Sequence, residues 1–241
     1  MGKKYRRILM SVVRCCVVLL AAGFRMVDEA SEYRLWYTTP ATIWRSQCLP
    51  VGNGSIGGMI YGGVASEHIQ FNEITLWTGG TTDEGTGNYL GFGELYVDVA
   101  NAGGTQSNYE RDLDIGEALA HVSYTIGSIT YNREYFASFP DSVMVGHFTG
   151  STAGGISLTV RVVPLSGLTY TSVSATGNVI TFSGYENSGA DLPRLNFEAQ
   201  VFVRAYGGTA TVQDATIRVG VEQSGKRVVL QSPLGSFSVH P

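Results

Sequence analysis

The sequence predicts an all-β protein built as a large antiparallel β-sandwich (a super-sandwich), and three observations support this fold class. Many short runs alternate between apolar and polar residues with a period of two, which is typical of strands with one buried face. Turn residues separate these runs at spacings of about 8–15 residues, which favours a sandwich over a βαβ fold. No long helical periodicity is present, and 241 residues are enough to bury a full core.

Residues 1–30 are predicted to be an export segment followed by a short polar spacer. Four basic residues precede a mostly apolar run from 8 to 24, which ends in the small residues LAAG at 20–23, a sequence that a signal peptidase accepts. The run is short and carries Arg14, so no stable membrane span is expected. The prediction is a secreted or periplasmic protein.

Charge and composition exclude several classes of function. The net charge is −4, and no basic stripe follows the N-terminus, so nucleic acid is not an expected partner. The four histidines show no metal-ligand spacing, and no phosphate loop stands out, so neither a metal nor a cofactor is predicted. Cys48 is the one cysteine beyond the export segment, and a buried apolar role is expected for it.

The segment 49–63 is predicted to be a hairpin with Asn53-Gly54 at its turn. Residues 52–57 also satisfy G-x-G-x-x-G, but a dinucleotide site needs a strand before this motif and a helix after it. Pro50 lies just upstream, and the glycine-rich stretch that follows cannot start a stable helix. A nucleotide site is therefore not predicted.

The next strand, from residue 69, changes its alternation near Glu73. Ile69, Phe71 and Glu73 share one face, whereas Ile74 and Leu76 take the opposite parity. A bulge or a turn at this point would re-aim the side chains.

Asn72, Glu73 and Trp77 are the candidate residues for a substrate rim or a domain-interface rim. In one interpretation, the carboxylate is held at a pocket rim or a domain junction; in the other, Asn72 and Glu73 bond only to local backbone and neighbouring loops. Trp77, like Trp36 and Trp44, is expected in the core or in an interface, because such rings bury large areas. The alternative is an exposed ring that stacks on sugar.

No pair of carboxylates is identified as catalytic. Glycoside hydrolysis usually needs two carboxyl groups across the scissile bond, and no spacing here forces such a pair together. Asp112 and Asp114 would point the same way on a strand, with Arg111 and Arg133 as neutralising partners. Asp114 and Glu117 also fit the cap of a short helical turn within 112–121.

The remainder of the chain is predicted to be strands and loops. Longer surface loops are expected at 81–93 and 100–107. In the clearest strand, 195–206, six apolar residues share one parity: Leu195, Phe197, Ala199, Val201, Val203 and Ala205. Further strands are predicted at 122–126, 129–137, 143–148, 156–162, 179–182 and 215–221.

Several segments, in order along the chain, resemble glycoside hydrolase family 95, the α-L-fucosidases. They are LPVGNGSIGGMIYGG at 49–63, IQFNEITLWTGG at 69–80, GFGELYVD at 91–98, YERDLD at 109–114, VSYT at 122–125 and YNREYFASFPD at 131–141. The resemblance implies that residues 31–222 are the non-catalytic N-terminal β-sandwich of an exported enzyme. Such enzymes hydrolyse terminal α-1,2-linked fucose with inversion of configuration. Their catalytic groups lie in a helical barrel, and no position of this chain matches the motifs of that barrel.

The chain departs from the family pattern in two places. Cys48 stands where a small residue is usual. Residues 223–241 form an atypical tail in place of the expected apolar strand, so the sequence does not predict the final strand of the sandwich, and its loss would expose an unpaired edge. The interpretation is a truncated fucosidase, inactive alone, whose fucosylated glycan binds through the missing catalytic domain. The alternative is a stand-alone carbohydrate-binding sandwich that uses exposed aromatics such as Trp77 or Tyr89.

Overall fold

The computed structural model describes residues 33–78, 87–100, 102–186, 195–221 and 227–239. The predicted export segment and residues 81–86 of the first predicted loop lie outside this set. The described residues form strands and one short helix, α2 (Trp44–Gln47). The strands are β1 (Arg34–Tyr37), β2 (Leu49–Gly52), β3 (Ile56–Ile60), β4 (Ser66–Glu73), β5 (Gly93–Val99), β6 (Gln106–Asp114), β7 (Leu119–Ile126), β8 (Ile129–Ser138), β9 (Val143–Gly150), β10 (Ile156–Pro164), β11 (Leu168–Thr176), β12 (Val179–Glu186), β13 (Leu195–Ala205), β14 (Gly208–Gln213), β15 (Thr216–Val221) and β16 (Arg227–Val239).

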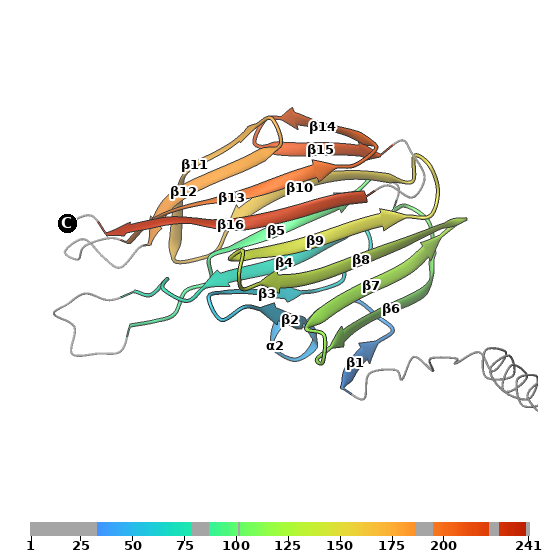
Figure 1. Cartoon of the computed structure of the whole chain (residues 1–241), viewed down its shortest axis with the longest axis horizontal. Coiled ribbons are helices and arrows are strands. Elements are labelled where there is room, and N and C mark those ends of the chain that lie inside the picture. Colours follow the sequence, from blue (N-terminus) through green and yellow to red (C-terminus); the bar gives the residue numbers. More distant parts are fainter. Residues whose placement is uncertain (1–32, 79–86, 101, 187–194, 222–226, 240–241) are drawn as a thin grey trace, which may run out of the picture. The chain divides into compact units, whose positions relative to one another are not determined.

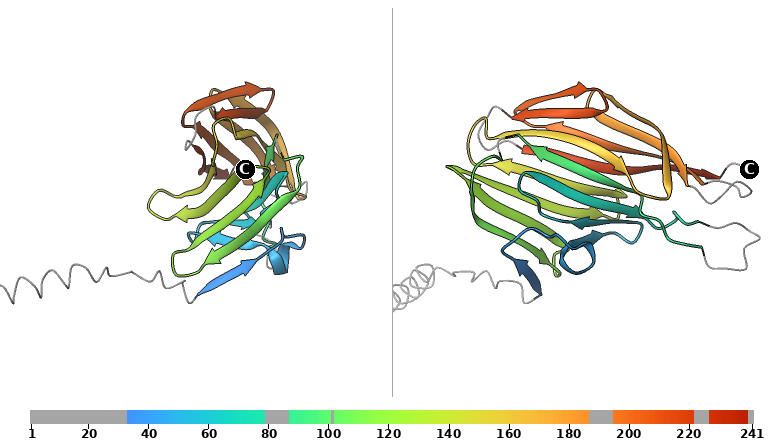
Figure 2. Two further views of the ribbon diagram at one scale, coloured as in Figure 1. Left: turned by 90° about the vertical axis from the view of Figure 1, so that its right-hand side faces the viewer. Right: turned by 180° about the vertical axis from the view of Figure 1, so that it is seen from behind.

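These strands make two antiparallel sheets packed face to face, as the alternating sequence predicts (Figure 1). One sheet has nine strands in the order β1-β6-β7-β8-β9-β16-β13-β12-β11, and the other has seven in the order β14-β15-β10-β5-β4-β3-β2. The nine-stranded sheet faces the viewer in Figure 1, and the view from behind in Figure 2 brings β4 and β5 to the front. The fold class predicted from sequence, an antiparallel β-sandwich, is confirmed.

The core lies between the sheets and is built by period-two alternation. In β13, Phe197, Ala199, Val201 and Val203 are buried, while Glu198 on the other parity is exposed. Aromatic rings fill the space between the sheets near one end; the ring centroids of Phe92 and Phe197, for example, lie 4.8 Å apart. Burial of this alternating apolar face is what holds the two sheets together.

The final strand, which the sequence left open, is formed by the tail. Residues 227–233 of β16 pair with β9, and β16 also pairs with β13, so the strand lies inside the nine-stranded sheet instead of leaving an exposed edge. Its inward residues Val228 and Leu230 are buried. This apolar pair supplies the strand pattern that the polar and proline-containing neighbours obscure in the sequence.

Two predicted turns differ in detail from the structure. The β2–β3 hairpin forms, but its reversal is centred on Gly54 and Ser55, one residue later than predicted: Asn53 N donates to Ile56 O, and Asn53 Oδ1 accepts from both Ser55 N and Ile56 N. Gly54 has φ +91°, which a residue without a Cβ adopts readily. The predicted helical turn within 112–121 is a tight β6–β7 turn instead, in which Asp114 Oδ1 accepts from Glu117 N.

Candidate functional site

Glu73 lies at the end of β4, where the chain turns out of the sheet. Its carboxylate is buried, and Oε2 accepts hydrogen bonds from Thr75 N at 2.8 Å and from Thr75 Oγ1 at 2.5 Å. Ser55 Oγ lies 3.5 Å from Oε1, and Ile74 N donates to Ser55 O. Glu73 therefore fixes the turn at 73–76 and ties it to the β2–β3 hairpin.

Asn72 and the following residues explain the change of alternation seen in the sequence. Asn72 Oδ1 accepts from Glu73 N at 2.9 Å, and Leu76 N donates to Glu73 O, which closes a tight turn. The turn leaves Ile74 53% exposed and buries Leu76 completely. The predicted re-aiming of side chains at this point is confirmed, and its cause is a turn.

Trp77 and Tyr89 pair across the two segments that follow this turn. Their backbones form an isolated antiparallel bridge, and their ring centroids lie 5.1 Å apart. Trp77 Nε1 donates to Ile74 O at 2.8 Å, which fixes the indole on the surface. Trp77 is 48% and Tyr89 47% exposed, so with Ile74 they form one exposed apolar group, hereafter the Trp77 patch.

The structure brings part of the predicted rim together. Glu73 lies near Tyr89 of the Trp77 patch, and burial together with the Glu73 charge raises the pKa of Tyr89. Asn72 instead contacts the strand end, where its side-chain Oδ1 accepts from Glu73 N. The expectation of a core position for the tryptophans is wrong, since Trp36 and Trp44, like Trp77, are exposed in the described chain; an interface position stays a prediction.

The arginines do not neutralise the aspartates as predicted. Arg111 donates to Thr39 O and Gln47 O and lies over the Tyr37 ring, where it anchors the loop that follows β1. Two backbone carbonyls and an aromatic face thus satisfy this buried guanidinium without a carboxylate.

Asp112 has other partners. Arg34 Nη2 lies 2.9 Å from its Oδ1, and His121 Nδ1 lies 3.2 Å from its Oδ2. Burial opposes ionisation, but the hydrogen bonds from His121 and Arg34 outweigh it and lower the pKa of Asp112 to about 2. The same contact with Asp112 raises the pKa of His121. Arg34, Asp112 and His121 together brace β1, β6 and β7.

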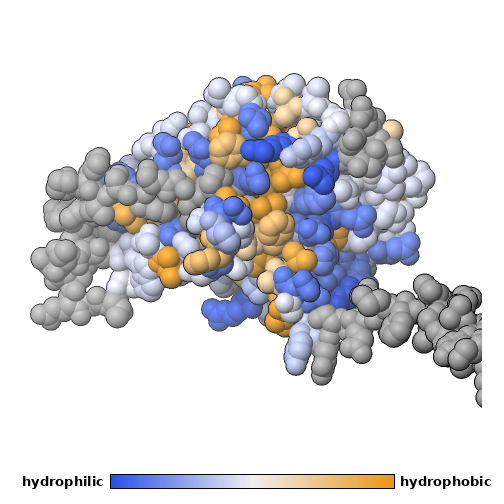
Figure 3. Space-filling view, in the orientation of Figure 1, coloured by the Kyte–Doolittle hydropathy of each residue, from blue (hydrophilic) through white to orange (hydrophobic). Residues whose placement is uncertain are grey.

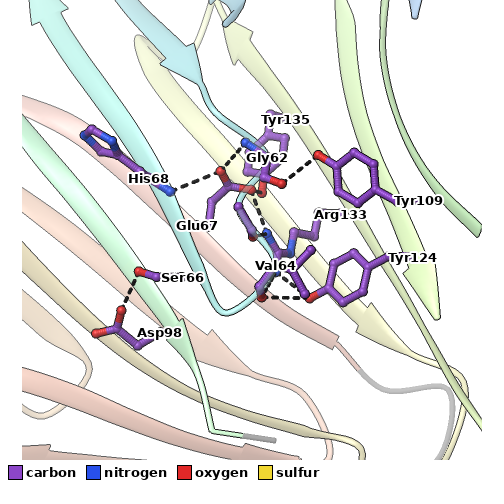
Figure 4. A network of polar contacts seen from close by, with 11 residues as sticks. Gly62, Val64, Ser66, Glu67, His68, Asp98, Tyr109, Tyr124, Arg133 and Tyr135 are labelled. Atoms are coloured by element: carbon purple, nitrogen blue, oxygen red, sulfur yellow. Dashed lines mark hydrogen bonds and ion pairs between the residues drawn. The ribbon is translucent and has the colours of Figure 1, made fainter. Parts of the chain in front are cut away.

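A buried charged cluster that the sequence did not predict links the two sheets (Figure 4). Arg133 on β8 donates from Nη1 to Glu67 Oε2 on β4 at 2.7 Å, and Tyr135 OH donates to the same oxygen at 2.6 Å. Gly62 N and His68 N donate to the other oxygen. We call this the Glu67–Arg133 clasp.

Every group of the clasp has a partner, so it is built to hold the fold. Arg133 also donates to Gly63 O, Val64 O and Tyr124 OH. Burial and the Glu67 charge hold the pKa of Tyr135 well above its usual range. The one available sequence signal was that Glu67 shares the parity of the buried residues of β4.

Among the described residues, no group of three or more potential ligands of the His, Cys, Asp and Glu types lies close enough to hold a metal ion. In the same residues, no helix has the length and apolar character required to cross a membrane.

Comparisons with known proteins find similarity to a glycosyl hydrolase domain family and to two proteins named as fucosidases. The family model for the N-terminal domain of glycosyl hydrolase family 65 matches residues 35–87 and 81–234. Alpha-L-fucosidase 2 of Arabidopsis thaliana is 31% identical over 169 residues, which cover 55% of this chain and 20% of that protein. "Probable alpha-fucosidase A" of Aspergillus niger is 24% identical over 183 residues, which cover 59% of this chain and 22% of that protein.

The chain therefore spans about a fifth of the length of the curated relatives it matches. Among solved structures, a protein provisionally named as a kojibiose phosphorylase from human microbiome aligns with a TM-score of 0.48 and 10% identity, over 86% of this chain and 32% of that one.

Proposed function

Because the chain belongs to the family of N-terminal domains of glycosyl hydrolase family 65, we propose that it is the non-catalytic N-terminal sandwich of an exported enzyme resembling the family 95 α-L-fucosidases. The observation that carries the proposal is the family match over residues 35–234, nearly all of the described sandwich. Similarity to two proteins named as fucosidases supports fucosylated glycans as the substrates of the whole enzyme.

The roles of three buried carboxylates support a non-catalytic domain. Glycoside hydrolysis needs one carboxyl group as an acid and a second as a base or nucleophile, both facing the sugar. Glu67 is fully enclosed in the clasp, Glu73 fixes a turn, and Asp112 is held by Arg34 and His121. These groups are already engaged in holding the protein together.

The Trp77 patch is proposed as the surface on which the remainder of the enzyme packs. Ile74, Trp77 and Tyr89 expose apolar area side by side, and exposed apolar groups of this kind typically mark an interface. Glu73 holds the turn that presents the patch. In this arrangement, Glu73 and Trp77 belong to the domain-interface rim, and Asn72 supports the strand end beside it.

Fucose release by the purified chain tests the non-catalytic role. With 2′-fucosyllactose and 4-nitrophenyl α-L-fucopyranoside, we expect no product above the buffer rate. Turnover that disappears in Glu73→Gln, with the fold intact by circular dichroism, would overturn the proposal.

A stand-alone carbohydrate-binding module is the second candidate. The observation that favours it is the exposed pair of rings, Trp77 and Tyr89, tilted by 40° and open to solvent. Titration with 2′-fucosyllactose separates the candidates: a binding module loses affinity in Trp77→Ala while its melting temperature is unchanged, and a docking surface shows no binding that Trp77→Ala removes. Val212→Ala, at another exposed apolar residue, is the matched control.

A further inference from the structure

The outer face of the nine-stranded sheet carries ordered rows of side chains across neighbouring strands. Register places Glu134, His147, Val229 and Arg204 side by side on β8, β9, β16 and β13. A second row, two residues along, contains Phe136, Val145, Gln231 and Phe202. Each row crosses three strand spacings, or about 14 Å.

These rows line a groove of about 610 Å³, hereafter the outer groove. Val145 points away from the core and is nevertheless only 7% exposed, so the face is hollowed around it. Figure 3 shows this side of the molecule, where hydrophobic residues form a band flanked by hydrophilic ones. An apolar floor with a few polar groups around it is the usual character of a site for a small ligand.

The charges in the outer groove are separated. Arg204 and Arg227 lie at one end, and among the described residues neither has a carboxylate within ion-pair distance. Arg227 lies over the ring of Tyr206, 4.9 Å from its centroid, which orients its guanidinium. Glu134 and Asp141 line the other side. The two guanidinium groups suit an anionic group at their end, whereas Glu134 and Asp141 oppose a second anionic group at the other side.

His147 lies between these charges and contributes a polar atom without a partner. Its Nε2 is buried and makes no hydrogen bond among the described residues. Burial, with help from Arg227, lowers the pKa of His147, which favours the neutral ring. The enclosed Nε2 does not reach an occupant of the groove, so the His147 ring forms part of the wall of the outer groove.

We propose that the outer groove binds an oligosaccharide that carries a single carboxylate, such as one uronic acid unit. Arg204 and Arg227 bind the carboxylate, Glu134 bonds to ring hydroxyls, and the apolar faces of sugar rings lie against Phe136 and Phe202. Guanidinium groups recognise carboxylates through paired charge-assisted hydrogen bonds, which makes the acidic sugar the favoured occupant. This site is separate from the Trp77 patch and does not depend on its role.

The test uses the full chain and a matched pair of ligands. The first is a trisaccharide of two xylose units and one glucuronic acid, and the second is the same sugar with its carboxyl group reduced to the alcohol. Calorimetry at 0.15 M salt is expected to show binding of the acidic sugar at least tenfold tighter than the reduced one. Arg204→Gln and Arg227→Gln each remove this difference, whereas Arg218→Gln, an exposed arginine on β15 of the other sheet, keeps it.

Three results would overturn the proposal. They are equal affinity for the two sugars, no binding of either sugar at millimolar concentration, and unchanged binding in both arginine variants. Sedimentation of the same samples checks the other occupant of such a face, a second copy of the chain. A dimer that dissociates in Arg204→Gln would replace the sugar with a protein interface.

Discussion

Replacing Arg133 by methionine should destabilise the sandwich by about 3 kcal/mol. Glu67 and Arg133 are both fully buried, and removing one partner of such a pair costs about 3–5 kcal/mol because the other charge stays unpaired in the core. The lower end applies here, since Gly62 N, His68 N and Tyr135 OH still donate to the Glu67 carboxylate. For a sandwich of this size, the melting temperature falls by about 6–12 °C.

Urea unfolding followed by tryptophan fluorescence and circular dichroism measures this loss. Adding Glu67→Gln to Arg133→Met should restore at least 1 kcal/mol, because the unpaired charge is gone while the amide oxygen still accepts from backbone N–H groups. The control is Arg161→Met, which breaks an exposed ion pair with Asp98 and should cost less than about 1 kcal/mol. Equal losses for the buried and exposed arginines, or additive losses in the double variant, would refute the reasoning.

Three further predictions concern stability and reactivity. At pH 5 the wild type should be more stable than Asp112→Asn by about 2 kcal/mol, and this difference should shrink as the pH falls from 3.8 towards the folded pKa of about 2. The reason is that the contacts which lower the pKa of Asp112 stabilise the folded protein only while the carboxyl group is ionised. Urea titrations from pH 5 to 2.5 measure the difference, and a difference that stays constant contradicts the prediction. Burial raises the pKa of Cys48 to about 11, so this thiol should resist iodoacetamide at pH 8 in the folded protein and react once urea unfolds it. The test uses a variant in which the other two cysteines are serine, and rapid alkylation of the folded variant contradicts the prediction. Gly184→Ala should cost about 2 kcal/mol by thermal unfolding, because its Cβ would lie 2.0 Å from Thr169 O, whereas Gly103→Ala, which meets open space, should be neutral; similar losses at both sites contradict this.

Period-two alternation was sufficient to predict the fold class and most strands. In β13 the parity of Phe197 to Val203 matches the observed burial, and the parity change at Glu73 matches the turn that ends β4. These features depend on residues that are adjacent in the chain, so they can be predicted from the sequence alone. The tail was harder, because Val228 and Leu230 are only a short apolar signal and the strand depends on the open backbone groups of β9 and β13.

The clasp and the outer groove depend instead on which strands become neighbours. Glu67 and Arg133 are 66 residues apart and meet only because β4 packs opposite β8. Arg204 lies near His147 because β16 inserts between β9 and β13. A single sequence contains no register between distant strands, so neither cluster could be predicted from residue types and spacing alone.

The most direct test of the account is a chimera. Its central claim is that this sandwich acts as the N-terminal part of a fucosidase-like enzyme and packs on the remainder through the Trp77 patch. Residues 33–239 would replace the matching segment of Alpha-L-fucosidase 2 of Arabidopsis thaliana, and fucose release from 2′-fucosyllactose would be measured. The account predicts an active chimera that loses at least tenfold in activity with Trp77→Ala and Tyr89→Ala together, and loses nothing with Val212→Ala. A folded chimera that is inactive, or one whose activity ignores the patch, would contradict it.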